Sequence, residues 1–132
     1  MKNSFVIPCN PKVYDVVKHF EQCETIYWKR GASEKNGDDV YIYIGVPEKA
    51  IKYKCVVEND NVSKDELKDH VYATKGNGMS CKYMKLRKIY EFNEPIDLET
   101  IKMLGIYMIR KQGKADRNLL LHLIMEERRQ SK

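Results

Sequence analysis

Alternation of apolar and polar residues predicts a chain made largely of short strands. Residues 39–44 alternate valine and isoleucine with two tyrosines, which predicts a strand with two different faces. Residues 50–57 alternate apolar side chains with lysines, which is typical of a half-buried strand. One face of that strand would carry Ile51, Tyr53, Cys55 and Val57. Further strands are predicted at 5–7, 25–28 and 81–92.

Helical spacing and capping residues predict helices between and after these strands. Asn10 followed by Pro11 is typical of a helix start, because Asn caps the first turn and Pro suits the first helical position. Ser63 and Glu66 form a capping box. The predicted helices cover 11–22, 64–70, 97–104 and 115–129. Polar, glycine-containing segments predict loops at 31–38 and 75–78.

Strands that are mostly not separated by long helices favour an α+β fold. The chain of 132 residues has room for one domain with one core, which would span 1–132. The natural packing is a small curved sheet, or a partly closed barrel, of five or six strands with flanking helices.

Composition narrows the class of protein. Charged residues make up 33% of the chain and the net charge is +5, which permits contact with a phosphate backbone without demanding it. No apolar run approaches the roughly 20 residues that cross a bilayer, and the N-terminus lacks the apolar core of a signal peptide. We therefore expect a cytoplasmic protein with no membrane partner.

The cysteines and histidines do not indicate a metal site. No C-x-x-C pair is present, so we expect no metal and no cofactor. The cysteines are interpreted as buried free thiols. They are Cys9, Cys23, Cys55 and Cys81. The three histidines share no motif and are interpreted as surface or packing residues.

Catalytic signatures are absent from the sequence, which favours a binding protein over an enzyme. No phosphate-binding loop and no G-x-S-x-G elbow is present. Asp38, Asp39 and Lys54 could imitate a two-carboxylate nuclease site. A small nuclease, or a subunit of a restriction or defence system, is therefore kept as the alternative. A protein-interaction or small-molecule sensor domain is a third interpretation.

Two residues near strand ends carry the binding hypothesis. Trp28 is the only tryptophan, and it is either a core residue or a platform on which a nucleobase stacks. Lys29 and Arg30 follow it and could contact phosphate. Asn10 is either a helix cap or a residue that reads a base edge through its amide.

Basic residues cluster in two further segments. They are either ordinary surface charge or, together with Lys29 and Arg30, one positive rim around a site. The clusters are Lys82, Lys85, Arg87 and Lys88, and Arg110, Lys111, Lys114 and Arg117.

Several of these motifs resemble the EVE-type domains of the PUA-like superfamily. The resemblance rests on residues 5–11, Trp28-Lys29, residues 37–43 and residues 51–55, and extends to Tyr83 and beyond. More narrowly, the chain resembles a bacterial module that occurs alone or in front of HNH-type nuclease domains. No HNH cluster is present here, so association with a nuclease partner is expected rather than nuclease activity.

The resemblance implies a small pseudo-barrel that binds DNA or RNA. Related YTH and SRA domains take a modified base into an aromatic pocket. The pocket residues implied here are Asn10, Trp28, Tyr41, Tyr43 and Gly45. The expected phosphate-contacting residues are Lys29, Arg30, Lys85, Arg87 and Lys114. Two segments depart from the family pattern: the opening lacks the family's tryptophan, and Lys114 follows Gln112-Gly113 in place of a proline.

Overall fold

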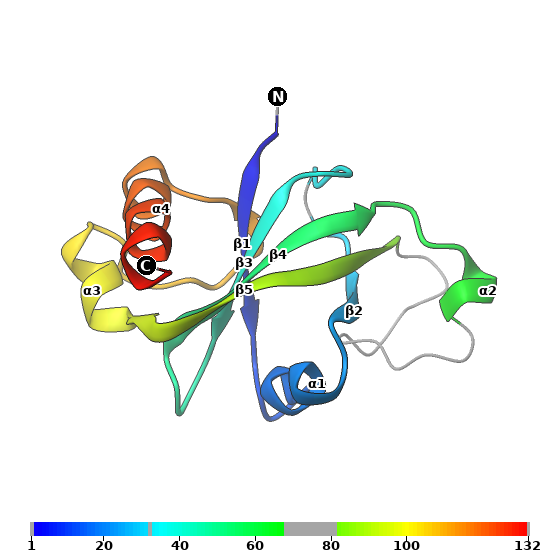
Figure 1. Ribbon diagram of the computed structural model, residues 1–132, viewed down its shortest axis with the longest axis horizontal. Helices are drawn as coiled ribbons and strands as arrows, with labels where there is room; N and C mark the ends of the chain where they lie inside the picture. Colours follow the sequence, from blue (N-terminus) through cyan, green and yellow to red (C-terminus); the bar gives the residue numbers. More distant parts are fainter. Residues whose placement is uncertain (1, 32, 68–81, 132) are drawn as a thin grey trace.

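The computed structural model describes residues 2–31, 33–67 and 82–131. The strands are β1 (Ser4–Cys9), β2 (Thr25–Lys29), β3 (Asp39–Ile44), β4 (Ala50–Asn59), β5 (Tyr83–Asp97) and β6 (Gly113–Lys114). The helices are α1 (Val16–Gln22), α2 (Lys64–Leu67), α3 (Leu98–Met103) and α4 (Arg117–Gln130). One sheet contains all six strands in the order β2-β5-β4-β3-β1-β6 (Figure 1). β1 and β3 run parallel, whereas the other neighbours run antiparallel.

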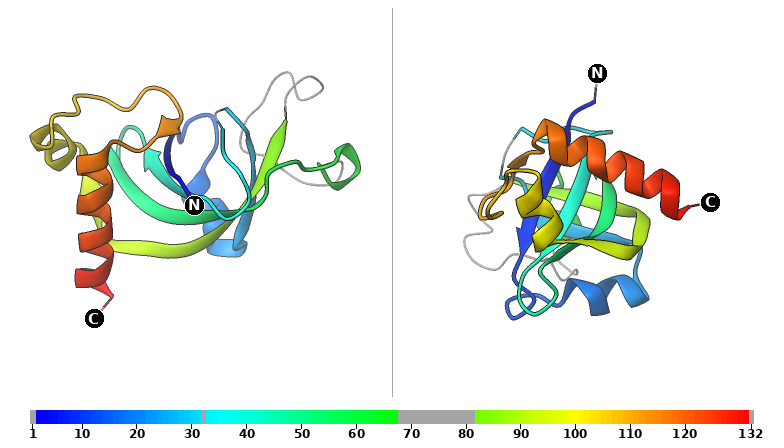
Figure 2. Two further views of the ribbon diagram at one scale, coloured as in Figure 1. Left: turned by 90° about the horizontal axis from the view of Figure 1, so that it is seen from above. Right: turned by 90° about the vertical axis from the view of Figure 1, so that its left-hand side faces the viewer.

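The sheet curls strongly, as Figure 2 shows. Side chains from β1 to β5 and from α1 therefore meet in one apolar cluster on one face of the sheet. A second cluster lies on the opposite face, where α3 and α4 cover the strands (Figure 1). These features confirm the predicted α+β fold with a small curved sheet of five or six strands and flanking helices. The short strand β6 lies where the sequence predicted only a turn.

β3 runs through the middle of the molecule and is buried on both faces. Val40, Ile42 and Ile44 enter the first cluster, while Tyr41 and Tyr43 enter the second, as the alternation predicts.

β4 departs from its predicted alternation at Lys52. Ile42 pairs with Tyr53 and Tyr43 pairs with Ile51, so Lys52 is one extra residue in the strand. A bulge of this kind changes which face the following side chains take. Ile51 therefore lies in the second cluster, whereas Tyr53 lies in the first. The prediction that these two residues share a face is wrong.

The first helix begins later than predicted. Its N-cap is Asp15, whose carboxylate accepts from Lys18 N at 3.1 Å, so Asn10 and Pro11 precede the helix and form a turn. α3 begins after Asp97, as predicted, and Gly105 with φ of 92° follows its end. α4 has Asp116 as its N-cap, two residues later than expected.

Several sequence predictions fall partly or wholly on residues that the structure does not describe, including position 32 of the predicted loop at 31–38 and position 81 of the predicted strand at 81–92. α2 starts at Lys64 behind Ser63, whose hydroxyl accepts from Glu66 N at 3.2 Å. Positions 68–70 of that predicted helix lie outside the described residues. The predicted loop at 75–78 lies outside them as well.

A side chain links the two outer strands of the sheet. Gln112 precedes β6, and its Nε2 donates to the carbonyl of Lys29 at 3.0 Å and to Glu34 Oε2 at 2.8 Å. Lys29 is the last residue of β2, so the link closes one end of the curled sheet. A Cβ on Gly31 would stand 2.7 Å from Gln112 Cδ, so a larger residue here would require the Gln112 side chain to move.

Candidate functional site

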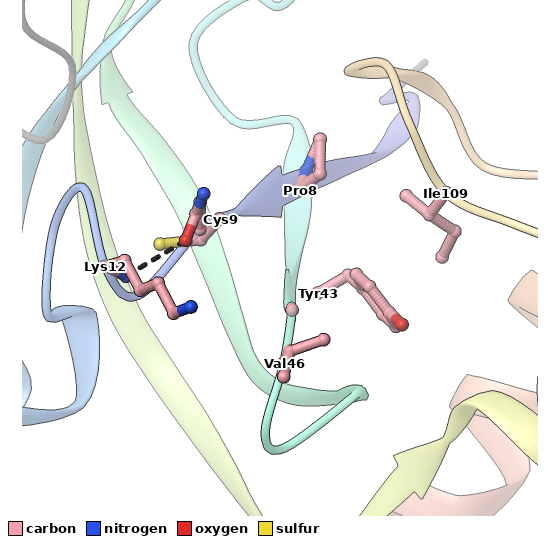
Figure 3. A pocket seen from close by; sticks show the side chains of 8 residues that line it. Pro8, Cys9, Lys12, Tyr43, Val46 and Ile109 are labelled. Carbon is pink, nitrogen blue, oxygen red and sulfur yellow. Dashed lines mark hydrogen bonds between the residues drawn. The ribbon is translucent and has the colours of Figure 1, made fainter.

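A cavity opens where β1 and β3 end. Because these strands are parallel, with Cys9 opposite Ile44, both leave the sheet at the same edge. The cavity has a volume of about 370 Å³. Its walls come from the ends of the two strands, the turns after them and the segment before β6 (Figure 3). The lining residues are Pro8, Cys9, Asn10, Lys12, Tyr43, Gly45, Val46 and Ile109.

Asn10 shapes the turn after β1. Its carbonyl accepts from Val13 N at 2.9 Å and from Tyr14 N at 3.0 Å, while its side-chain Oδ1 accepts from Lys12 N at 3.0 Å. A backbone N–H only donates, so the amide oxygen faces the turn. No described residue accepts a hydrogen bond from Asn10 Nδ2. The amide therefore keeps two donor hydrogens for a ligand.

Tyr43 forms the aromatic part of the cavity wall. Only 7% of the residue is exposed, because its ring also packs in the second apolar cluster. Burial raises the pKa of Tyr43 above its ordinary value of 10, so the hydroxyl is protonated at neutral pH. A protonated phenol can both donate and accept hydrogen bonds.

Gly45 ties the two turns together. Its N–H donates to the carbonyl of Cys9 at 2.9 Å, and its carbonyl accepts from Lys49 N at 3.1 Å. Burial raises the pKa of the Cys9 thiol to about 11, so this thiol is a poor nucleophile at neutral pH. The arrangement can hold a ligand, and nothing in it activates Cys9 for catalysis.

The hollow continues along residues 106–111. Two neighbouring cavities share Met108, Ile109 and Arg110 with one another, and one of them also shares Tyr43 with the first cavity. The further cavity extends to Lys114 and to the start of α4. Together they form a groove from the ends of β1 and β3 to β6.

Cations without acidic partners border this groove. None of them lies within 4.0 Å of a carboxylate belonging to a described residue, although the Arg110 guanidinium contacts the Met108 sulfur. They are Lys12, Lys49, Arg110, Lys111 and Lys114. Cations of this kind can bind phosphate without first breaking an ion pair.

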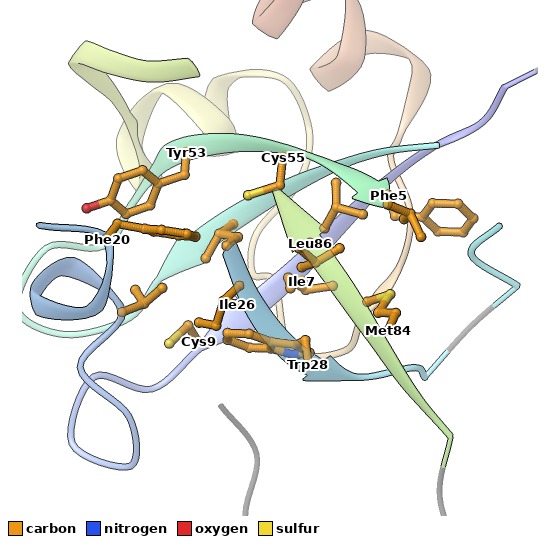
Figure 4. Packing of buried hydrophobic residues seen from close by; sticks show 14 of the residues in the cluster. Phe5, Ile7, Cys9, Phe20, Ile26, Trp28, Tyr53, Cys55, Met84 and Leu86 are labelled. Carbon is orange, nitrogen blue, oxygen red and sulfur yellow. The ribbon is translucent and has the colours of Figure 1, made fainter. Parts of the chain in front are cut away.

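Trp28 does not line the groove. It is 3% exposed and packs in the first apolar cluster beside Ile26 and Met84 (Figure 4). Tyr41 is fully buried in the second cluster, with Lys54 Nζ 5.9 Å from its ring centre. The expectation that Trp28 and Tyr41 form a base pocket is therefore corrected, because both side chains are used in the core. The structure brings together Asn10, Tyr43 and Gly45 from the predicted set.

Lys29 and Arg30 have structural contacts at the end of β2. The Lys29 carbonyl accepts from Gln112, and Arg30 Nε donates to the carbonyl of Glu34 at 2.9 Å. Neither residue lines the groove. The expected role of Lys29 and Arg30 beside a stacking tryptophan loses its basis, since Trp28 is buried.

Lys85 and Arg87 lie on β5 and already pair with carboxylates. Lys85 Nζ is 3.3 Å from Glu58 Oε1, and Arg87 contacts both Glu58 and Glu24. The hydrogen bond from Arg87 lowers the pKa of Glu58 below its ordinary value. Lys114 therefore lines the groove, whereas Lys85 and Arg87 are held in an ion-pair network on β5 and line none of its cavities. A phosphate contact by Lys85 or Arg87 stays a prediction.

The acidic residues of the alternative nuclease site have structural partners. Asp38 accepts from Asn3 N and Lys35 N, both at 2.9 Å. Asp39 pairs with Lys2 at 3.1 Å, and Lys54 pairs with Glu127 at 2.9 Å. Each of the three side chains is therefore already engaged by a structural partner. Across 2–31, 33–67 and 82–131, no group of three or more His, Cys, Asp or Glu side chains is placed to hold one metal ion.

The cysteine prediction holds in part. Cys9 and Cys55 are buried, Cys23 is exposed, and Cys81 lies outside the described residues.

None of the helices within the described ranges is long and apolar enough to cross a membrane.

Sequence reasoning missed several groove residues. Lys12 lies in the turn after β1, and Lys49 lies in the turn immediately before β4. Met108 and Ile109 belong to a segment whose apolar residues follow no regular period. The useful signal was the pair of turns, Asn-Pro and Gly-Val-Pro, each following an apolar strand. Those turns meet only because β1 pairs in parallel with β3.

No family model matches the sequence, and no curated protein matches it. Solved structures do match it over nearly its whole length. Human THYN1, in complex with DNA containing 5-methylcytosine, is 11% identical with a TM-score of 0.68, covering 96% of this chain and 98% of that chain. A hypothetical protein from Leishmania major is 13% identical with a TM-score of 0.66, covering 98% of both chains.

The ASCH protein from Zymomonas mobilis is a further structural relative. It is 12% identical with a TM-score of 0.56, covering 93% of this chain and 94% of that chain. Identities this low show the fold alone. With its curled six-stranded sheet and flanking helices, the chain has the PUA-like fold.

Proposed function

We propose that this chain is a non-catalytic nucleic-acid-binding module of the EVE type, which takes a base into the cavity beside Asn10 and Tyr43. The observation that carries the proposal is this cavity of about 370 Å³, which continues into a groove bordered by five cations with no carboxylate partner among the described residues. The complex of human THYN1 with 5-methylcytosine-containing DNA supports it, because that protein shares the fold.

The cavity offers the contacts that a flat, polar ligand needs. The Tyr43 ring provides an aromatic surface, and the Asn10 amide provides donors for an acceptor on the base edge. Pro8, Val46 and Ile109 supply an apolar wall, against which a methyl group on a modified base would fit.

The groove offers the contacts that a phosphate backbone needs. If all five cations contact phosphate, the logarithm of duplex affinity falls with the logarithm of salt concentration with a slope of about −4.5. Raising salt from about 50 mM to about 200 mM then weakens binding by about 500-fold. An affinity that does not change with salt concentration would contradict a phosphate contact.

Fluorescence anisotropy with labelled oligonucleotides tests this interface. Single-stranded and duplex DNA and RNA, with and without 5-methylcytosine, are titrated at several salt concentrations. The double variant Arg110→Gln with Lys111→Gln should reduce the magnitude of the slope by about 1.8. The matched control, Lys85→Gln with Arg87→Gln, removes the same charge from the ion-paired strand and should leave the slope unchanged. If the two double variants change the salt slope equally, the phosphate-binding surface does not lie at the groove.

The base contact is tested separately from the phosphate contact. Tyr43→Leu keeps an apolar side chain in the core and removes the ring, so it should weaken oligonucleotide binding by about 1–3 kcal/mol if a base stacks there. Circular dichroism confirms that the variant is folded. Binding of free nucleosides without salt-sensitive oligonucleotide binding would instead favour a small-molecule sensor.

Two parts of the sequence-based expectation remain predictions. A nuclease partner rests on the resemblance to modules that precede HNH-type domains. A cytoplasmic location is a prediction from the sequence pattern alone. Co-purification and fractionation of the tagged native protein would test them.

A further inference from the structure

α4 exposes apolar side chains on the side turned away from the core. Its inner side buries Leu119 and Leu123. On its outer side, Leu121 is 53% exposed and Met125 is 67% exposed. Positions 117, 121, 125 and 128 follow one another at spacings of four, four and three, so they form one stripe along the helix. We call Arg117, Leu121, Met125 and Arg128 the outer face of α4.

The acidic residues of α4 are used elsewhere, which leaves the outer face positive. Glu126 pairs with Arg129 at 2.8 Å, and Glu127 pairs with Lys54 at 2.9 Å. Within the part of the chain that the structure describes, no carboxylate lies within 4.0 Å of the Arg117 or Arg128 guanidinium. The outer face therefore has an apolar centre with a free cation near each end.

This face is separate from the groove of the proposed function. α4 lies on the outside of the molecule (Figure 2). Asp116 and Leu119 at its start line a groove cavity, but none of the four outer-face residues does. The groove therefore gives no explanation for apolar side chains at these positions.

The charges decide what kind of partner fits. A second copy of this chain would place arginine against arginine, whether two α4 helices pair in parallel or antiparallel, and like charges in contact oppose association. A nucleic acid would satisfy the arginines but would leave Leu121 and Met125 facing a charged backbone. A protein surface with an apolar centre and acidic ends satisfies all four residues.

We propose that the outer face of α4 docks an acidic amphipathic helix of a partner protein. Its apolar side chains would cover Leu121 and Met125, and carboxylates would pair with Arg117 and Arg128. The two arginines are eleven positions apart on a helix that rises 1.5 Å per residue, so the carboxylates should be separated by about 16 Å, or three helical turns. Helices recognise such faces through anchors at spacings of three and four residues.

A designed peptide pair tests the docking. One labelled helix of about 16 residues carries leucines on one side with glutamates three turns apart, and its counterpart carries lysines in place of the glutamates. Fluorescence anisotropy at low salt should show the acidic peptide binding about tenfold more tightly or better. Leu121→Gln with Met125→Gln should weaken its binding about fivefold or more, whereas Ile89→Gln, an exposed apolar residue on β5, should not.

Charge reversal provides the decisive comparison. Arg117→Glu with Arg128→Glu should invert the preference, so that the basic peptide binds the variant more tightly. All variants change exposed side chains, and circular dichroism verifies their fold. Equal binding of the two peptides, or no binding of either, overturns the proposal.

Other occupants give different results. A dimer in sedimentation velocity that is lost in the Leu121 and Met125 double variant assigns the face to a second copy. Loss of oligonucleotide binding in the same variant assigns it to nucleic acid. Either result overturns the proposal of a protein partner, and neither depends on the groove variants at Arg110 and Lys111.

Discussion

Replacing Trp28 tests directly whether its indole serves the core or a ligand. The residue is 3% exposed in the first apolar cluster, among side chains from β1, β2 and β5. Truncating a buried aromatic removes its contacts and leaves a cavity, so Trp28→Ala should lower the free energy of unfolding by about 3–5 kcal/mol. That is a large share of the about 5–15 kcal/mol typical of a domain. Trp28→Phe removes fewer buried atoms and should cost about 1–2 kcal/mol.

The assay must not depend on tryptophan emission, because Trp28 is the only tryptophan in the chain. Urea unfolding followed by far-ultraviolet circular dichroism gives the free energy for each variant. In the wild type, Trp28 fluorescence provides an independent measure of burial, since acrylamide should quench a buried indole poorly.

Oligonucleotide affinity then separates the two roles. If the base binds beside Tyr43, folded Trp28→Phe should bind within about twofold of the wild type, because Trp28 lines none of the groove cavities and phenylalanine keeps an aromatic ring in the core. A loss of affinity above about tenfold with little change in stability would refute the core assignment. So would a Trp28→Ala cost below about 0.5 kcal/mol, the range of surface substitutions.

Three further predictions concern other parts of the molecule. Gly31→Ala should lower the free energy of unfolding by about 1–3 kcal/mol by crowding Gln112, and a double-mutant cycle with Gln112→Ala in urea should show that the two costs are not additive. Arg87 lowers the folded-state pKa of Glu58, so this pair contributes stability at neutral pH that is lost as pH falls through the depressed pKa; Glu58→Gln should flatten that part of an acid unfolding curve. Alkylation followed by peptide mass spectrometry should modify Cys23 before the two buried described thiols.

Much of the fold could be predicted because local patterns and tertiary contacts agree. β3 alternates because both of its faces are buried in different clusters, and Asp97 caps α3 because its carboxylate accepts from Thr100 N at 2.9 Å. The predicted start of the first helix at Asn10 was wrong, because an asparagine side chain can close a turn as well as cap a helix. Asn10 Oδ1 accepts from Lys12 N, and the helix begins only after its N-cap, Asp15.

The site could be predicted only in part. Asn10, Tyr43 and Gly45 follow apolar strands in the sequence, and the parallel pairing of β1 with β3 brings them to one edge. Trp28 has the same local signals as a stacking residue, and no local pattern says on which face of a curled sheet its side chain lies. Lys85 illustrates the same limit, because its partner Glu58 comes from a neighbouring strand.

The sequence by itself determined most of the elements, the two apolar faces of β3 and the turn residues after β1 and β3, because these depend on spacing along the chain. Only the tertiary structure decided which face of the curled sheet each aromatic residue occupies and which cations are already neutralised. The reason is physical: burial and ion pairing arise between strands that are distant in sequence. Curling of the sheet placed Trp28 inside, and the pairing of β1 with β3 left Asn10 and Tyr43 at an open groove.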